Sequence, residues 1–143
     1  MLIWTVRFMR IDIGGTPRII LNWRAGVYRF ASRSAMGKTF LFNRLASMFP
    51  CDPGIVLYTY RDYLRDVPVF SGDPSKCRLL FFDRLDLYKD APVVWRAIRD
   101  VKDHAMVLID LKNPTISIAD KVMENVGVSI IRSVNSLEVV CRF

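Results

Sequence analysis

The sequence predicts an α/β fold: a three-layer sandwich with a central, mainly parallel sheet, antiparallel N-terminal strands and a C-terminal hairpin. From residue 27 onward, short apolar runs typical of strands alternate with stretches typical of helices. The central runs are apolar at nearly every position, as in parallel strands covered by helices on both faces. The 143 residues suffice for one domain, spanning 1–143, and are too few for two ordinary ones.

The first part of the chain predicts strands. Residues 3–10 alternate imperfectly between apolar and polar side chains, and residues 18–23 form a second run rich in β-formers. Glycines and a proline between Asp12 and Pro17 predict a turn that joins these two strands as an antiparallel pair. A third strand is expected over residues 26–31.

The remaining elements follow in alternation. Apolar residues at 41, 42, 45, 48 and 49 have helical spacing and predict a helix over residues 38–49. Asp90 is a suitable N-cap, and Pro92 fits the first turn of a helix over residues 91–102. The final segment reads as a hairpin that turns at Asn135 and Ser136. The other expected strands cover residues 54–60 (an internal strand), 78–82, 105–111 and 128–133, and the other expected helices cover residues 63–67 and 116–125.

Composition excludes several classes of protein. Hydrophobic residues make up 52% and charged residues 24% of the chain, a balance typical of a globular protein. The longest apolar runs fall far short of the roughly 20 residues that cross a bilayer, so no membrane partner is expected. His104 is the single histidine, which rules out multi-histidine metal sites, and its sequence context favours a solvated or capping role. Three widely spaced cysteines predict reduced thiols and a cytoplasmic protein.

The positive charge is concentrated in the first third of the chain. Residues 1–49 carry eight Lys or Arg against one acid, Asp12, whereas residues 50–143 carry 13 basic and 13 acidic side chains. The whole net charge of +7 therefore lies in the first third. This asymmetry predicts a polyanionic ligand or partner, and nucleic acid is one candidate.

The most specific motif lies between a predicted strand and a predicted helix. Residues 32–39 read Ser-Arg-Ser-Ala-Met-Gly-Lys-Thr and match the phosphate-binding loop pattern G-x-x-x-x-G-K-[ST], except that Ser32 replaces the first glycine. Successive backbone N–H groups at the start of a helix form an anion receptor, and Gly37 allows close approach to phosphates. Lys38 supplies a positive charge to the terminal phosphates, and Thr39 offers a hydroxyl to Mg²⁺.

A second motif supplies a carboxylate. The apolar run from Leu79 to Phe82 ends at Asp83, which lies 45 residues after Lys38. An aspartate at the carboxyl end of a buried strand can hold the Mg²⁺ shell beside the phosphate loop. Together the two motifs predict a binding site for a nucleoside triphosphate with Mg²⁺, in which Thr39 and Asp83 are the metal ligands.

With these motifs the sequence resembles the P-loop NTPases over roughly residues 27–133. Residues 32–39 resemble Walker A and residues 79–83 resemble Walker B. The likeness is greatest to the branch that has an extra strand between the phosphate-loop strand and the aspartate strand, which includes AAA-, RecA- and ABC-type ATPases. The ABC signature Leu-Ser-Gly-Gly-Gln is absent, so membership of that group is not carried over.

The resemblance implies a set of site residues and two cofactors, ATP and Mg²⁺. It implies a polar sensor after the strand at 105–111, for which Asn113 is the first candidate and Lys112 or Asp110 the next. Lys38, Asp83 and Asp86 are the implied catalytic residues. The implied nucleotide-binding residues are Ser32, Arg33, Ser34, Ala35, Met36, Gly37, Lys38, Thr39, Phe40 and Asn113.

The chain departs from this family at the residue that follows Asp83. Most members of the branch have a glutamate there, which orients the attacking water, and this chain has Arg84. Asp86 is the next carboxylate, and it reaches the water only if the chain turns sharply; otherwise it is a helix cap or a partner of Arg84. Loss of the base leaves nucleotide binding intact and makes hydrolysis slow.

Three functions fit these observations. The first is a small Mg-ATP-binding protein with slow or partner-dependent ATPase activity, working with a protein partner or as a homo-oligomer. The second is a non-catalytic interaction module with a degenerate nucleotide site, which Ser32 and Arg84 favour. The third, ranked lowest, is a small-molecule kinase whose lid would have to come from residues 61–76. The aromatic residues Phe8, Trp23 and Tyr28 are expected to pack in the core or at an edge rather than against a base. Tyr58 and Tyr60, near the predicted Mg²⁺ shell, are expected to have a structural role.

Overall fold

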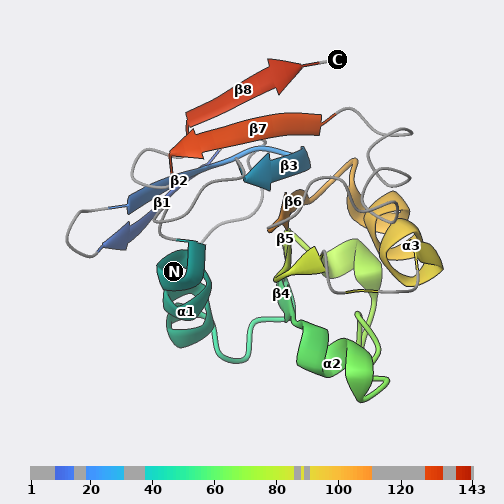
Figure 1. Cartoon of the computed structure of the whole chain (residues 1–143). Coiled ribbons are helices and arrows are strands. Elements are labelled where there is room, and N and C mark those ends of the chain that lie inside the picture. The colour runs from blue at the N-terminus through green and yellow to red at the C-terminus, as the bar shows by residue number, and fades with distance from the viewer. Residues whose placement is uncertain are drawn as a thin grey trace.

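The chain forms two sheets flanked by helices in a computed structural model that describes residues 9–14, 19–30, 38–85, 88, 91–110, 128–133 and 138–142 (Figure 1). The smaller sheet pairs β1 (Met9–Gly14) with β2 (Ile19–Trp23) in antiparallel fashion. The larger sheet has six strands in the order β4-β5-β6-β3-β7-β8. Its strands are β3 (Gly26–Phe30), β4 (Ile55–Tyr58), β5 (Leu79–Phe82), β6 (Met106–Ile109), β7 (Val128–Ser133) and β8 (Glu138–Arg142).

Five neighbouring strands of the larger sheet, from β4 to β7, run parallel to one another. Strand β8 pairs with β7 in the opposite direction and closes one edge, whereas β4 forms the other edge. The predicted α/β class is therefore confirmed. The expectation that residues 54–60 form an internal strand was wrong, because β4 lies at the end of the strand order.

Helices cover both faces of this sheet, which makes the three layers (Figure 1). Helix α1 (Lys38–Met48) packs on one face, and α3 (Ala91–Val101) packs on the other. The short helix α2 (Tyr60–Leu64) and the 3-10 turn η1 (Pro74–Lys76) lie between β4 and β5 in the chain. None of the described helices is long and apolar enough to cross a membrane.

Alternation along β5 explains why both faces are covered. Leu79 and Phe81 pack in the apolar cluster that contains Leu41 and Leu45 of α1. Leu80 and Phe82 point the other way, into the cluster that contains α3. All four side chains of β5 are fully buried, so this strand has no polar face.

The helices present stripes that match these two faces. Leu41 and Leu45 are one helical turn apart in α1 and are fully buried. In α3 the buried residues Val94, Ala97, Ile98 and Val101 have the spacing of one helix face. The helices predicted over residues 38–49 and 91–102 are thus confirmed within one residue at each end.

Three other predicted elements differ from the structure. The strand expected over residues 3–10 continues as β1 to Gly14, and residues 3–8 lie outside the described residues. The helix expected over residues 63–67 begins earlier, at Tyr60, because Thr59 and Asp62 form a capping box there. The turn expected from Asp12 begins later, since β1 continues to Gly14 with a register shift between Asp12 and Gly14. The predicted helix over 116–125 and the hairpin turn at Asn135 and Ser136 lie outside the described residues.

The central position of β5 makes a stability prediction. Phe81 is fully buried and meets Phe42 of α1 edge to face, with ring centroids 5.2 Å apart. We expect Phe81→Ala to lower the free energy of unfolding by about 3–5 kcal/mol, because it removes the ring and leaves a cavity. Leu64, which is 61% exposed, is the control, and Leu64→Ala should change stability by no more than about 0.5 kcal/mol. Urea denaturation followed by circular dichroism checks both, and equal losses would contradict the assignment of Phe81 to the core.

Candidate functional site

The predicted phosphate loop joins β3 to α1. Strand β3 ends at Phe30, and α1 begins at Lys38, the residue at which the motif predicts a helix start. Residues 32–37, from Ser32 to Gly37, lie outside the described residues, as do the side chains of Lys38 and Phe40. Thr39 is described, and its side chain is exposed in the first turn of α1.

The predicted metal ligand Asp83 directly follows β5. Its backbone N–H donates a hydrogen bond of 3.0 Å to the carbonyl of Tyr58 at the end of β4. The side chain is half-buried, and it interacts with neighbouring groups. Asp83 is therefore held at the carboxyl edge of the sheet by the ladder between β4 and β5.

The sheet register brings the ends of β3 and β5 to one level. Arg29 of β3 and Phe82 of β5 are both opposite Ile109 of β6, which lies between the two strands. Because all three strands are parallel, the residues that follow them emerge at the same edge. The carboxyl end of β3, which precedes the predicted phosphate loop in the chain, and Asp83 thus lie at the same edge of the sheet, with the end of β6 between them.

A buried carboxylate, Asp110, directly follows β6, the strand that lies between β3 and β5. It is 5% exposed, and its backbone N–H donates to the carbonyl of Phe82 at 3.0 Å. Its own carbonyl accepts from the N–H of Leu85 at 2.9 Å, which ties β6 to the turn after Asp83. The sequence ranked Asn113 above Asp110 as the polar group here. Asn113 and Asp86 lie outside the described residues.

The backbone changes direction at Arg84, the residue that replaces the expected glutamate. Arg84 has φ of 55°, in the left-handed region that non-glycine residues rarely adopt. The side chain is half-buried, and its Nε atom is buried without a hydrogen-bond partner. The strand therefore ends abruptly after Asp83, and a guanidinium group rather than a carboxylate follows the predicted metal ligand.

Four tyrosines and Phe82 form an aromatic cluster next to Asp83. Tyr63 stacks on both Tyr88 and Tyr60, with ring centroids 5.1 and 6.0 Å apart, and the Tyr88 hydroxyl donates to the carbonyl of Tyr58 at 3.2 Å. Burial raises the pKa of Tyr88, and the charges of Tyr58 and Asp83 raise it further, so this phenol stays neutral. The expected structural role of Tyr58 is confirmed, since its ring is 4% exposed.

Sequence reasoning did not single out Tyr63 or Tyr88. The signal for Tyr63 was the capping box at Thr59 and Asp62, which starts α2 directly after β4. Trp23 and Tyr28 are 5% and 4% exposed and lie in the core cluster beside α1, as expected. His104 is half-buried, and its Nε2 lies 3.2 Å from the carbonyl oxygen of Pro74.

The Mg²⁺ site that the sequence predicts is not a preformed cluster of ligands in the described residues. Within the described part of the chain no group of three or more His, Cys, Asp or Glu side chains could hold a metal ion. Mg²⁺ does not need such a group when it is bound with a nucleotide, because phosphates and waters fill most of its octahedral shell. A threonine hydroxyl and an aspartate carboxylate, the groups that Thr39 and Asp83 carry, are hard oxygen ligands of the kind that Mg²⁺ takes.

Comparison with protein-family models, with curated proteins and with solved structures finds no match to this chain.

The left-handed backbone at Arg84 generates a prediction. We expect Arg84→Gly to raise the free energy of unfolding by about 0.5–1 kcal/mol, because glycine adopts this conformation without steric cost. Asp66 is the matched control: it also has φ of 55°, but it lies in the exposed turn that ends α2. Asp66→Gly should stabilise by a similar amount.

Denaturation of both variants and of Arg84→Ala measures these effects. Arg84→Ala removes the same side chain and keeps the strained backbone, so it should be less stable than Arg84→Gly. If Arg84→Gly is destabilising while Asp66→Gly is stabilising, contacts of the Arg84 side chain outweigh the backbone strain.

Proposed function

We propose that this protein binds Mg-ATP at the carboxyl edge of its parallel sheet and acts as a slow or partner-dependent ATPase. The strand order β5-β6-β3 is the single observation that carries the proposal. Neighbouring strands are about 4.8 Å apart, so β3 and β5 lie roughly 10 Å apart with their carboxyl ends level. A triphosphate with its metal ion can span that distance, between the helix start at Lys38 and the carboxylate of Asp83.

Each group has a distinct role in this proposal. The backbone N–H groups from Ser32 to Thr39 and the positive end of α1 receive the phosphates. The Lys38 ammonium neutralises charge on the terminal phosphates, and the Thr39 hydroxyl and Asp83 carboxylate hold Mg²⁺. Mg²⁺ supplies charge neutralisation between the β- and γ-phosphates when it is bound. Asp110, or Asn113 beyond it, is the polar group near the γ-phosphate.

The resemblance to P-loop NTPases adds support from topology. The branch with an extra strand has that strand between the phosphate-loop strand and the aspartate strand. In this chain β6 lies between β3 and β5. Strand order is not determined by local sequence, so this agreement is independent of the two motifs.

Arg84 favours a second candidate function, a nucleotide-binding interaction module without hydrolysis. A general base must come within hydrogen-bond reach of the attacking water, directly or through one water. The turn at Arg84 puts a cation where the family has its base, and a cation cannot accept the proton. The module would use nucleotide binding to stabilise one conformation for a partner.

A kinase function has less support. The segment that would supply a lid, residues 61–76, includes Val69 and Phe70, which pack against the core cluster under β4. A lid needs freedom to open and close over the acceptor site.

The proposed partners are a protein partner, a second copy of this chain in a homo-oligomer, or nucleic acid bound by the basic first third of the chain. We propose a cytoplasmic location, because the sequence has three widely spaced cysteines, a pattern typical of reduced thiols.

Ligand-induced stabilisation tests nucleotide binding. At an Mg-ATP concentration of 100 times Kd, we expect about 2.7 kcal/mol of stabilisation and a rise in melting temperature of roughly 5–10 °C. Lys38→Ala should abolish the rise, since it removes the charge that pairs with the terminal phosphates. Differential scanning fluorimetry with ATP, GTP and ATP plus a chelator measures it.

The control for this experiment is a lysine at the opposite edge of the sheet. Lys102 lies just before β6, in an exposed pair with Asp103, so Lys102→Ala should keep the full rise. No rise with either nucleotide, or an equal rise in Lys38→Ala, would overturn the proposed site.

Single-turnover phosphate release distinguishes the two candidate functions. If hydrolysis is slow because a base is missing, Arg84→Glu should accelerate it by about 10²-fold or more, since general bases contribute 10²–10⁴-fold. Arg84→Gln is the matched control, because it removes the cation without supplying a base. Equal rates in the two variants, with Mg-ATP still bound, would favour the non-catalytic module. Loss of the wild-type rate in Asp86→Asn would identify Asp86 as the base instead.

A further inference from the structure

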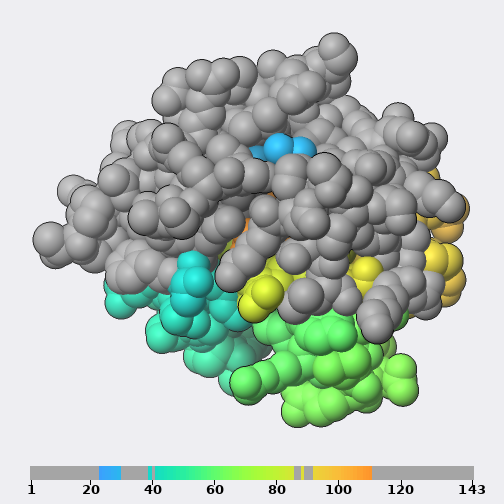
Figure 2. Space-filling view, viewed as in Figure 1, coloured from blue at the N-terminus to red at the C-terminus, as the bar shows by residue number. Residues whose placement is uncertain are grey.

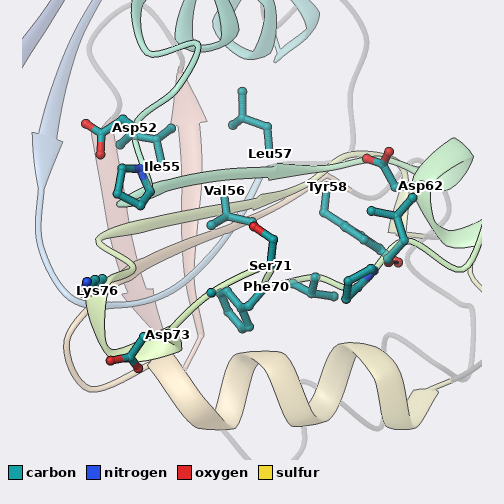
Figure 3. A pocket seen from close by; sticks show the side chains of 15 residues that line it. Asp52, Ile55, Val56, Leu57, Tyr58, Asp62, Phe70, Ser71, Asp73 and Lys76 are labelled. Atoms are coloured by element: carbon teal, nitrogen blue, oxygen red, sulfur yellow. Dashed lines mark hydrogen bonds between the residues drawn. The ribbon is translucent and has the colours of Figure 1, made fainter.

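A groove of about 430 Å³ runs along β4, the edge strand that lies farthest from β8 (Figure 3). One wall is β4 itself, and the other is the segment 67–73, which we call the strap. Asp52 lies toward the start of β4 and Asp62 toward its end (Figure 3). In the space-filling view, α1 and the region around α2 form the lower part of the surface (Figure 2).

The outer edge of β4 offers backbone hydrogen-bonding groups to this groove. The carbonyls of Gly54 and Tyr58 accept hydrogen bonds from Leu79 and Asp83, so these even-numbered residues face β5. In a parallel ladder, alternate residues direct their N–H and C=O groups to opposite sides. Leu57 therefore directs both its N–H and its C=O away from β5, and Ile55 does the same with its C=O. The Ile55 N–H is satisfied locally by the carbonyl of Asp52 at 3.1 Å.

The strap borders this edge without pairing with it. The Tyr58 hydroxyl donates to the carbonyl of Val67 at 2.8 Å, and Val69 and Phe70 pack against the core cluster on the α3 face. Among the described residues, no backbone hydrogen bond joins the strap to Ile55 or Leu57. The strap is thus anchored beneath β4, and the space beside the edge stays open.

Charges around the groove identify what it can receive. Three carboxylates, Asp52, Asp62 and Asp73, line it together with one ammonium group, Lys76. Asp62 is paired with Arg65 at 3.1 Å. Neither Asp52 nor Asp73 forms an ion pair with any described residue. Asp52 accepts a hydrogen bond from the backbone N–H of Gly54 at 2.8 Å, and Asp73 accepts one from the backbone N–H of Ser75 at 2.9 Å.

Asp73 remains ionised over a wide pH range. Its hydrogen bonds from the Ser75 side chain and backbone, followed by the charge of Lys76, lower its pKa. The groove therefore combines a sheet edge that pairs with no described strand with a local excess of negative charge, in a chain whose net charge is +7.

From this combination we propose that the groove binds an extended, basic segment of a partner protein, which adds to the sheet as a seventh strand beside β4. Leu57 donates one backbone hydrogen bond to the segment and accepts another, and the Ile55 carbonyl accepts a third. Lys or Arg side chains of the segment lie against Asp52 and Asp73. The apolar side chains of the segment alternate with these and contact the groove wall.

A pair of synthetic peptides tests the charge preference. The first is a fluorescein-labelled seven-residue peptide that alternates Lys and Val, and the second has Glu in place of every Lys. By fluorescence anisotropy, the Lys peptide should bind at least tenfold more tightly than the Glu peptide. The positive net charge of the protein opposes this order, so non-specific attraction cannot produce it.

Two variants at Leu57 test the backbone contact. Leu57→Pro removes the outward N–H, which an edge strand tolerates because that N–H takes no part in the ladder with β5. Leu57→Ala removes the same side chain and keeps the N–H. Leu57→Pro should bind the Lys peptide at least tenfold more weakly than Leu57→Ala does, with circular dichroism spectra that match.

Two further measurements keep the test decisive if Leu57→Pro does not fold. Asp52→Asn with Asp73→Asn keeps both hydrogen-bond acceptors and removes both charges, so it should weaken Lys-peptide binding severalfold and flatten its salt dependence. In the wild-type protein, the Leu57 amide should exchange with deuterium more slowly when the Lys peptide is added.

Three outcomes would overturn the proposal: equal binding of the two peptides, unchanged exchange at Leu57, or equal affinity of the two Leu57 variants for the Lys peptide. Self-association that Leu57→Pro abolishes would also overturn it, because the occupant would then be a second copy of this chain.

Discussion

Strand β6 forms parallel ladders with β3 on one side and with β5 on the other, and the rest of the candidate site depends on this pair of ladders. They bring Arg29 and Phe82 level with the same residue, Ile109, and so bring the chain after β3 and the chain after β5 to one edge. The ladders persist because β5 and β6 are buried at every position, between α1 and α3. Because both faces are apolar and buried, the polar side chains Asp83 and Asp110 lie at the positions that directly follow the two strands.

Sequence reasoning succeeded where a local pattern determines the structure. The Leu41 and Leu45 spacing matches the helical period and predicts α1. The continuous apolar run Leu79–Phe82 is typical of a strand buried on both faces and predicts β5. Sequence reasoning was less successful at α2 and β4. The start of α2 depends on a capping box that the sequence shows at Thr59 and Asp62, and that signal was overlooked. The edge position of β4 depends on the order in which distant strands pair, and no local pattern encodes that order.

The same distinction applies to the site. The positions of Lys38 at a helix start and of Asp83 after a buried strand are local properties, and both were predicted from sequence. The burial of Asp110 and the left-handed backbone of Arg84 depend on the turn that follows β5, in which the Leu85 N–H donates a hydrogen bond to the carbonyl of Asp110. They became visible only in three dimensions. The groove beside β4 could not be predicted from local sequence either, because it is formed by an edge strand and by the strap, which comes from a later part of the chain.

The groove and the candidate nucleotide site share one residue, Tyr58. Its carbonyl accepts hydrogen bonds from the N–H of Asp83 and from the hydroxyl of Tyr88, and its own hydroxyl donates to Val67 of the strap. A strand bound beside Leu57 would lengthen the sheet next to this residue and restrict its motion. Restricting Tyr58 also restricts Asp83, because the hydrogen bond between them is part of the β4–β5 ladder.

Coupling between two sites requires an element that both contact and that has more than one arrangement. The carboxyl end of β4 meets the first requirement. The turn at Arg84, whose left-handed backbone is next to Asp83, is the place where we infer a second arrangement. A protein partner in the groove would then act on Asp83, the metal ligand that we propose, without touching the nucleotide, and the proposed ATPase would in this way depend on its partner.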